Sequence, residues 1–190
     1  GPAPLRTPAP EKALPPLVRG DLVHRLLAGL PDLPSPEHAA AGLRLLRHAA
    51  DKVADEIHQE VLEEALGVLG HAPLADLFGA GSRAEVPVIG RLKAREGADF
   101  HVSGRIDRLA LTPDRLIVVD FKTDRTPPGR PEDVAEAYVA QLAVYGALLS
   151  QVFAGRMFEA RLVYTSGPRG FRLESARLEA ALARLGLTSA

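Results

Sequence analysis

Gly104-Arg105-Ile106-Asp107-Arg108-Leu109 and Val118-Val119-Asp120-Phe121-Lys122-Thr123-Asp124 are two apolar stretches that carry acidic residues. Their composition predicts two neighbouring strands, joined by the turn over 112–115. Acidic residues are depleted in strand interiors, and a carboxylate that is buried without a partner is costly. Asp107 and Asp120 therefore need a compensating cation, and a divalent metal is the obvious candidate.

Lys122 is expected on the same face of its strand as Asp120, because side chains alternate and Phe121 points to the other face. Mg²⁺ prefers oxygen ligands, usually one or two carboxylates together with water and phosphate oxygens. An ammonium group beside two carboxylates suits metal-assisted hydrolysis of a phosphodiester, with Lys122 holding the attacking water or steadying developing charge. The alternative is a structural ion pair at the end of a sheet. Spacing alone supports both interpretations equally.

The surrounding sequence predicts a sheet with helices before and after it. Apolar and polar residues alternate over 84–92, which predicts a strand, and the turn over 95–99 leads into the strand over 100–111. After the third strand, over 116–122, a polar loop leads into a helix over about 132–151. A strand over 159–165, a short strand over 171–173 and a helix over 175–185 complete the pattern.

Helical periodicity dominates the first 80 residues. It follows a stretch with six prolines within residues 1–19, which is typical of a linker or extended arm. The first helix begins near Val18 and stops over 29–31. Ser35-Pro36-Glu37 is typical of a helix start, with a hydroxyl cap and a proline at the first helical position. The helix that follows either continues to Gly70 or breaks and restarts, and a last helical turn covers 74–78.

Two further groups of residues are candidates for chemistry. Tyr138, Gln141 and Tyr145 share one face of the predicted helix, where a glutamine amide and phenols can contact phosphates or bases. The structural alternative is that both tyrosines pack on the sheet and Gln141 caps a strand carbonyl. His24 lies alone in the first helix, and local chemistry alone favours a structural histidine there. A helical face with His48, Asp51, Asp55 and His58 has metal-ligand spacing, but a solvated polar face explains it better.

Composition excludes several classes of site. The chain has no Cys, which excludes disulfides, Cys-based zinc sites and Cys-ligated iron–sulfur clusters. None of its four lysines follows a glycine, so a phosphate-binding loop is absent. The sequence shows neither a signal peptide nor a membrane-length apolar run, and we expect a cytoplasmic bacterial protein. Residues 83–130 hold 10 basic and 7 acidic residues, a mild excess where a polyanion would approach.

In their order along the chain, these motifs resemble the RecB-type nuclease domain, a branch of the PD-(D/E)xK superfamily. The resemblance covers about residues 15–173 and is strongest to the C-terminal nuclease domain of the AddA-type subunit of bacterial AddAB helicase–nucleases. It rests on His24, then Gly104 to Leu109, then Asp120-Phe121-Lys122-Thr123-Asp124, and then Tyr138, Gln141 and Tyr145. Each piece is weak alone, and their ordered combination is specific.

The resemblance implies an α/β fold with a restriction-endonuclease-like core, in which a mixed central sheet is flanked by helices, and a helical N-terminal segment. On this basis we expect a proline-rich linker or arm over 1–17 and a single nuclease domain over 18–190. Within that domain, 18–80 is the helical segment, 83–175 the catalytic core and 176–190 the terminal helix.

The resemblance also implies roles for individual residues. A helical histidine joins the two acids in holding the metal, so the expected ligands are His24, Asp107, Asp120 and the main-chain carbonyl of Phe121. Lys122 matches the catalytic lysine, beside Asp107 and Asp120.

On the same resemblance, Gln141 and Tyr145, with Tyr138, are expected to contact DNA. In related folds an early acid also joins the metal, which makes Glu85 a further candidate. The alternative for Glu85 is an ion pair with Arg105.

The function implied is a Mg²⁺-dependent deoxyribonuclease, with Mn²⁺ able to replace Mg²⁺ and no iron–sulfur cluster. It would act as an exonuclease on single-stranded DNA ends supplied by a helicase, during recombinational repair of double-strand breaks. The expected partners are the helicase portion of the same full-length protein and an AddB-like subunit. The rival is a catalytically silent domain that binds DNA ends or docks a partner subunit.

Overall fold

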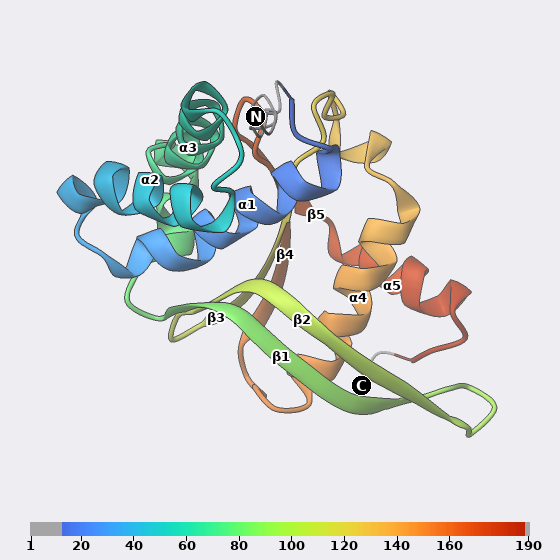
Figure 1. Ribbon diagram of the computed structural model, residues 1–190. Coiled ribbons are helices and arrows are strands. Elements are labelled where there is room, and N and C mark those ends of the chain that lie inside the picture. Colours follow the sequence, from blue (N-terminus) through green and yellow to red (C-terminus); the bar gives the residue numbers. More distant parts are fainter. Residues whose placement is uncertain (1–12, 189–190) are drawn as a thin grey trace, which may run out of the picture.

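The structure is a computed structural model that describes residues 13–188 (Figure 1). Its helices are α1 (Pro16–Gly29), α2 (His38–Ala49), α3 (Asp55–Leu69), α4 (Glu136–Ser150) and α5 (Ser175–Arg184). Short 3-10 helices are η1 (Leu30–Asp32), η2 (Ser35–Glu37), η3 (Ala72–Phe78) and η4 (Pro131–Asp133). The strands are β1 (Ser82–Lys93), β2 (Asp99–Leu111), β3 (Arg115–Lys122), β4 (Met157–Tyr164) and β5 (Arg169–Leu173). Most of the expected proline-rich arm, residues 1–12, lies outside the described residues.

The strands form one mixed sheet in the order β1-β2-β3-β4-β5, which confirms the predicted fold class. Three of the four strand pairs are antiparallel, and β3 pairs with β4 in parallel. A parallel pair needs a long crossover connection, and α4 provides it between β3 and β4. The crossover places α4 against the sheet next to the end of β3, where the acidic residues lie.

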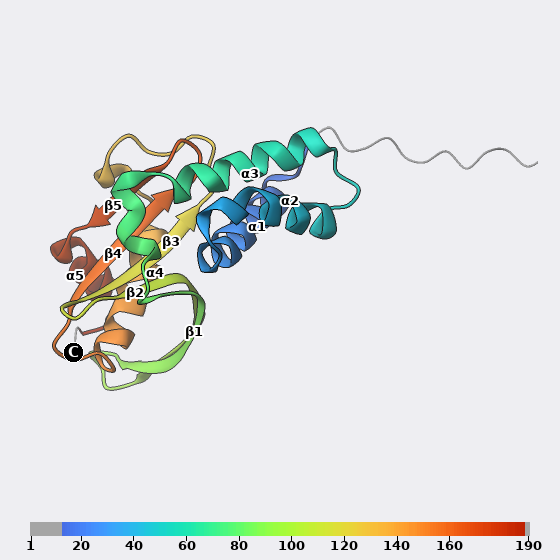
Figure 2. The same ribbon diagram turned by 90° about the vertical axis from the view of Figure 1, so that its left-hand side faces the viewer.

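Helices cover both faces of the sheet. The side chains of β3 are apolar on both faces, so each face needs such a cover. Ile117, Val119 and Phe121 pack against the N-terminal helices, including α1, α3 and η3. Leu116 and Val118 face the other way, into a core that includes α4 and α5. Figure 2 shows α1, α2 and α3 together on one side of the strands. Full burial of each such side chain contributes about 1.5–3 kcal/mol, so both layers hold β3 firmly.

The structure settles one point that the sequence left open and differs from the prediction at two helix starts. The helix after Ser35-Pro36-Glu37 breaks and restarts: Ala50 leaves helical geometry with φ −140° and ψ 60°, and α3 starts afresh at Asp55. Ser35 makes no side-chain cap, since it lies within η2 and α2 begins only at His38. The crossover helix begins at Glu136 rather than 132, after the separate turn η4. Within residues 13–188 no helix combines the length and the apolar character needed to cross a membrane.

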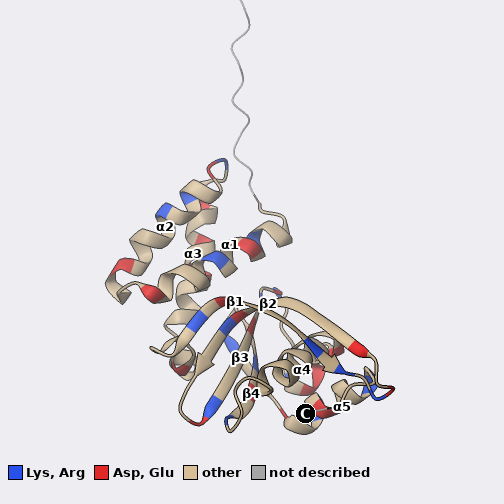
Figure 3. Ribbon diagram, turned by 90° about the horizontal axis from the view of Figure 1, so that it is seen from below, with Lys and Arg blue, Asp and Glu red and all other residues tan. Residues whose placement is uncertain are grey.

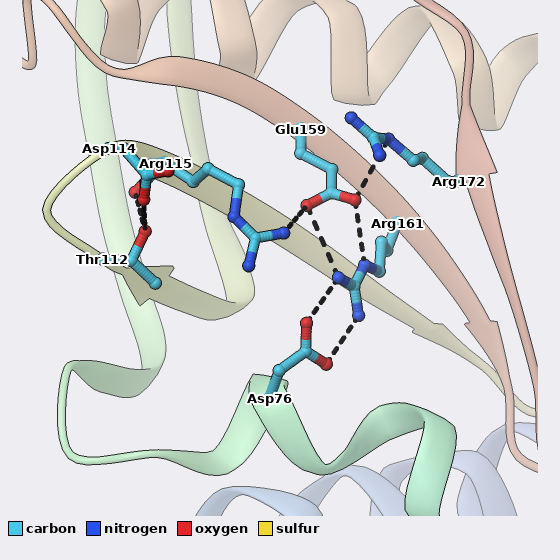
Figure 4. Close-up of polar contacts among 7 residues, drawn as sticks. All are labelled: Asp76, Thr112, Asp114, Arg115, Glu159, Arg161 and Arg172. Atoms are coloured by element: carbon cyan, nitrogen blue, oxygen red, sulfur yellow. Dashed lines mark hydrogen bonds and ion pairs between the residues drawn. The ribbon is translucent and has the colours of Figure 1, made fainter.

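An ion-pair network holds η3 to the sheet (Figure 4). Asp76 of η3 accepts two hydrogen bonds from Arg161 of β4, at 2.8 and 2.6 Å. The carboxylate of Glu159, which is almost fully buried, contacts Arg161 and also Arg115 and Arg172, at 3.1–3.3 Å. Because Glu159 and Arg161 both face the N-terminal helical layer, the network fixes η3 on β3, β4 and β5.

Candidate active site

The sheet splits at Asp107, and the split creates the site. β2 covers Asp99–Leu111, but β3 pairs only with its last part, from Arg108 opposite Val119 to Leu111 opposite Leu116. Before that point β2 stays with β1 alone, and the hairpin curves away from the sheet (Figure 1). Phe121 pairs with Val163 of β4 but has no partner on β2, and its N–H donates to Asp107 Oδ2 at 2.8 Å. The side chain of Asp107 thus replaces the missing ladder hydrogen bond.

His24 reaches the split from α1. Leu22, Val23, Leu26 and Leu27 are buried in the core beneath the sheet, and this packing turns His24 toward the end of β3. Its Nδ1 lies 2.7 Å from the Gly20 carbonyl oxygen, and its Nε2 lies 2.9 Å from the Phe121 carbonyl oxygen. The same Nε2 is 3.2 Å from Asp107 Oδ2.

The surroundings of His24 require a positive charge. Nδ1 faces a carbonyl oxygen and must donate to it, while Nε2 faces two oxygens that are acceptors only. Burial alone would lower the pKa of His24, but the hydrogen bond and charge of Asp107 outweigh it and raise that pKa to about 9. Burial opposes ionisation of Asp107 as well, yet contact with His24 lowers the pKa of that carboxyl below its usual value.

Asp120 and Lys122 lie on the other side of the split, facing α4. The Lys122 ammonium is 2.9 Å from Asp120 Oδ2, but this contact lacks hydrogen-bond geometry. Asp120 Oδ2 is buried and accepts no hydrogen bond from residues 13–188. Burial, followed by the proximity of Asp107, raises the pKa of Asp120 to about 7. For Lys122, burial opposes the charge but the attraction of Asp120 prevails and raises its pKa.

These groups suit a small divalent cation. Ligands at about 2.0–2.1 Å from an octahedral ion lie about 3.0 Å from their neighbours. His24 Nε2 has this spacing from the Phe121 carbonyl oxygen, at 2.9 Å, and nearly so from Asp107 Oδ2, at 3.2 Å. The unsatisfied oxygen of Asp120 is a fourth candidate ligand. Within the described chain no three acidic or histidine side chains are already gathered as a complete site, since Asp120 is turned toward Lys122.

Helix α4 lines the opposite wall. The Lys122 ammonium lies 4.0 Å from the centre of the Tyr138 ring, which holds it by a cation–π contact. Gln141 is exposed and donates from Nε2 to the Tyr145 hydroxyl at 3.4 Å. Tyr145 is buried and packs closely on Gly104, where an added Cβ would collide with its hydroxyl. Tyr145 therefore packs on the sheet, which is one part of the structural alternative, whereas Gln141 faces solvent and bonds Tyr145 rather than a strand carbonyl.

Residues from α1, from the ends of the strands and from α4 line one open cavity of about 840 Å³. The predicted residues that line it are His24, Asp107, Asp120, Phe121, Lys122, Tyr138 and Gln141. Arg19, Arg105 and Arg125 also line the cavity and supply positive charge. Figure 3 shows further Lys and Arg positions along β1 and β2. Asp21 and Asp124 line the cavity as well, and Arg19 and Arg105 pair with Glu64 and Glu85, so the positive charge around the acidic centre is modest.

Glu85 is placed apart from this cavity. Its carboxylate lies 3.5 Å from Arg105, as the ion-pair alternative predicted, and Glu85 does not line the cavity. Its backbone is unusual, with φ 54°, in the left-handed region that only Gly adopts readily. It occurs at the one position where pairing between β1 and β2 is interrupted, opposite Asp107. The strain thus marks the place where the hairpin bends away.

Arg108 is a supporting residue that the sequence did not reveal. Its guanidinium is 2% exposed and donates to the Leu27 carbonyl oxygen and to Ser82 Oγ. It also lies 5.1 Å from the centre of the Phe78 ring, which in turn stacks on Phe121 at 6.3 Å. Arg108 thereby ties α1, which carries His24, to β2 and β3. The sequence feature that could have revealed this buried role is the place of Arg108 within an apolar strand, next to Asp107.

Arg19 and Glu64 support the end of β3. Arg19 forms an ion pair with Glu64 and donates to the Thr123 carbonyl oxygen at 3.2 Å. Glu64 also accepts from Thr165 Oγ1 at 2.9 Å, and the Thr165 N–H donates to the Lys122 carbonyl oxygen. This network joins α1, α3 and the residue after β4 around Lys122.

The His48 to His58 face is not a metal site. His58 is buried and lies 2.8 Å from the Ala50 carbonyl oxygen, while Asp55 pairs with Arg47. The helix break at Ala50 leaves His48 on α2, Asp51 in the turn, and Asp55 and His58 on α3. Their polar character is explained by contacts at the helix break.

Sequence comparison gives one family match and several partial relatives. The model of the PD-(D/E)XK nuclease superfamily matches residues 3–183. The chain is 41% identical over 61 residues to an ATP-dependent helicase/nuclease subunit, of the AddA type, from Desulforudis audaxviator, a match that covers 32% of the chain and 5% of that protein. A protein of the same description from Pelotomaculum thermopropionicum is 34% identical over 67 residues, covering 35% and 5%. The chain thus matches only about one-twentieth of the length of these relatives.

Among solved structures, one described as the crystal structure of SSO0001 aligns with a TM-score of 0.40 and 17% identity. The alignment covers 88% of this chain and 82% of that one.

Proposed function

The chain belongs to the PD-(D/E)XK nuclease superfamily, and we propose that it hydrolyses DNA phosphodiester bonds with the help of a divalent metal. The observation that carries the proposal is the convergence of His24 Nε2, Asp107 Oδ2 and the Phe121 carbonyl oxygen in the split of the sheet. A bound metal would take the place of the Nε2 proton of His24 and supply the positive charge between these atoms. Asp120 Oδ2, which lies 2.9 Å from the Lys122 ammonium, is a further candidate ligand.

Each residue has a distinct task in this proposal. His24, Asp107, Asp120 and the Phe121 carbonyl would hold Mg²⁺ or Mn²⁺. The metal, when bound, would lower the pKa of water and neutralise charge on the phosphate. Lys122 would hold the attacking water or steady the charge that develops on the phosphate, and the Tyr138 ring beneath its ammonium fixes its position.

Gln141 faces the cavity and can donate to a phosphate oxygen or a base edge. Tyr145 would act through Gln141, because its hydroxyl accepts from the glutamine amide and its ring is buried. Among the candidate DNA contacts, Gln141 is thus the direct one and Tyr145 its support.

We place this activity in a larger machine of the bacterial cytoplasm. The two relatives described as ATP-dependent helicase/nuclease subunits support a nuclease that works beside a helicase. On the resemblance of the motifs, we propose further that it is an exonuclease that degrades single strands supplied by a helicase, in recombinational repair of double-strand breaks. Its partners would be a helicase portion of the same protein and an AddB-like subunit. A silent domain that only binds DNA ends or docks another protein is the rival, and the same experiment separates the two.

Cleavage of labelled single-stranded DNA tests the proposal directly. With Mg²⁺ or Mn²⁺ we expect cleavage that a chelator abolishes, and that falls at least about 100-fold in Asp120→Ala and Lys122→Ala, as when a key electrostatic group is removed. Asp51→Asn and Lys52→Ala are matched controls, because both residues are exposed in the turn between α2 and α3. Equal, chelator-insensitive behaviour of wild type and both site variants would overturn the proposal, and the absence of any cleavage above background would favour the silent domain.

Metal binding provides a second measurement that does not depend on turnover. Calorimetric titration with Mn²⁺ should show binding, and saturating metal should raise the unfolding temperature through mass action. His24→Ala and Asp107→Asn should weaken both effects, and Asp51→Asn should leave them unchanged. Equal metal binding in all of these variants would remove His24 and Asp107 from the site.

A further inference from the structure

A second hollow adjoins the catalytic cavity along β2. It has a volume of about 260 Å³ and lies between β2 and α4, with Leu185 after α5 at one side. Phe100, Val102 and Ser103 line it from β2, and Gln141 and Tyr145 line it from α4. Gln141 lines the catalytic cavity as well. The two hollows are therefore neighbours that share one residue.

The hollow has the lining of a slot for a flat apolar group. Val102 and Tyr145 are buried and form its floor, while Ser103 and Gln141 are exposed polar residues at its rim. Phe100 keeps 38% of its surface exposed, and within residues 13–188 it stacks on no other aromatic ring. A partly exposed aromatic side chain that no other ring stacks on is suited to stacking on a nucleobase without regard to sequence.

The split of the sheet leaves a path between the two hollows. Among the described strands, β3 adjoins β2 only over residues 108–111, so the edge of β2 from 99 to 107 has no strand beside it. This edge runs from Asp107, at the catalytic centre, to Phe100. At about 3.3 Å per residue, the path is about 20 Å long, enough for several nucleotides. Arg105 lines the catalytic cavity at the start of this path and supplies a positive charge for the backbone.

We propose that the hollow at Phe100 is a nucleobase subsite, which holds a single-stranded nucleic acid by stacking one base on the Phe100 ring a few nucleotides from the bond that is cut. The inference rests on the proposed nuclease function and adds a contact that would hold the single strand beside the catalytic centre. Only an unpaired strand exposes the face of a base, so the subsite selects single strands over blunt duplex.

The test compares substrates that can and cannot reach Phe100. For wild type, kcat/KM should rise from a dinucleotide to an octanucleotide. In Phe100→Ala this gain should fall about tenfold, mainly through KM, while the dinucleotide is cleaved as by wild type. Phe100→Trp should retain the gain. Ile89→Ala is the matched control, because Ile89 is 84% exposed on the same hairpin and lines neither hollow.

A binding measurement separates failure of the subsite from failure of the nuclease proposal. Octanucleotides with a single 2-aminopurine, bound in Ca²⁺, should show quenched fluorescence at one position, and Phe100→Ala should abolish that quenching. Cleavage with equal length dependence in wild type and Phe100→Ala would overturn the subsite and leave the nuclease intact. Absence of cleavage with Phe100-dependent quenching would overturn the nuclease and leave the subsite. Quenching that is unchanged in Phe100→Ala, or a blunt duplex that binds with the same dependence on Phe100, would contradict the inference.

Discussion

At the scale of single residues, Glu85 has a strained backbone. With φ 54° a residue with a Cβ is about 1–2 kcal/mol less stable than in a right-handed conformation, and Gly avoids this cost. We expect Glu85→Gly to raise the free energy of unfolding by about 1 kcal/mol, because its exposed ion pair with Arg105 contributes little. Urea denaturation followed by circular dichroism measures the change.

Glu85→Ala is the control that separates strain from charge. It removes the carboxylate but keeps the Cβ, so it should be no more stable than wild type. The metal titration of both variants should match wild type, because Glu85 lies outside the catalytic cavity. A loss of metal affinity in both variants would return Glu85 to the metal site, as its place early in the first strand suggested.

The sequence predicted which residues share a strand face better than it predicted the long-range contacts around each residue. Strand alternation placed Asp120 and Lys122 on one face, where the structure has their side chains 2.9 Å apart. It could not show that β2 leaves β3 at Asp107, because that split depends on how the hairpin bends rather than on strand composition. The buried guanidinium of Arg108 was missed for a similar reason, since its partners Leu27 and Ser82 are distant in sequence.

At the scale of elements, the network around Asp76 makes the docking of η3 depend on pH. The hydrogen bonds from Arg161 lower the pKa of Asp76 below its ordinary value. A carboxyl with a lowered pKa stabilises the fold above its unfolded pKa, and this contribution is lost as pH falls through the folded value. Asp76→Asn should therefore destabilise by about 0.5–1 kcal/mol at pH 5–7. The difference from wild type should shrink as pH falls below about 4 and vanish only below the lowered folded pKa of Asp76.

Urea denaturation at several pH values between 3 and 7 measures this difference. Asp133→Asn is the control, because Asp133 forms an exposed ion pair with Arg130 within η4 and the loop before it. A difference between wild type and Asp76→Asn that stays constant down to pH 3 would show that Asp76 acts by packing rather than by charge.

The order and type of the elements were predictable, but their exact ends were not. Alternation and periodicity gave all five strands and the helices around them, because these patterns reflect burial on one face or two. The break at Ala50 was left open by the sequence, since neither Gly nor Pro marks it. The late start of α4 follows from Pro131, which forms its own short turn η4 before the helix.

At the scale of the whole molecule, the N-terminal helices and the sheet act as one folding unit. Leu22 and Leu26 of α1 share a core with Val119 of β3, and Arg108 bonds across it to the Leu27 carbonyl oxygen. The candidate metal site is divided in the same way, with His24 on the helical side and the other ligands on the sheet. We therefore propose that the boundary near residue 80 separates two parts of one domain.

A split chain tests this unity. We expect residues 1–80 and 81–190, expressed separately, to lack cooperative unfolding, because each would expose its half of the shared apolar core. Mixed together, they should regain helical and sheet signals by circular dichroism and bind Mn²⁺ as the intact chain does. The intact chain carrying a protease site between Gly79 and Gly81 is the control, and after cleavage it should stay associated, since the interface is already formed. Cooperative unfolding and full metal affinity of 81–190 alone would contradict the prediction, because His24 would then be dispensable and the helical layer a separate domain.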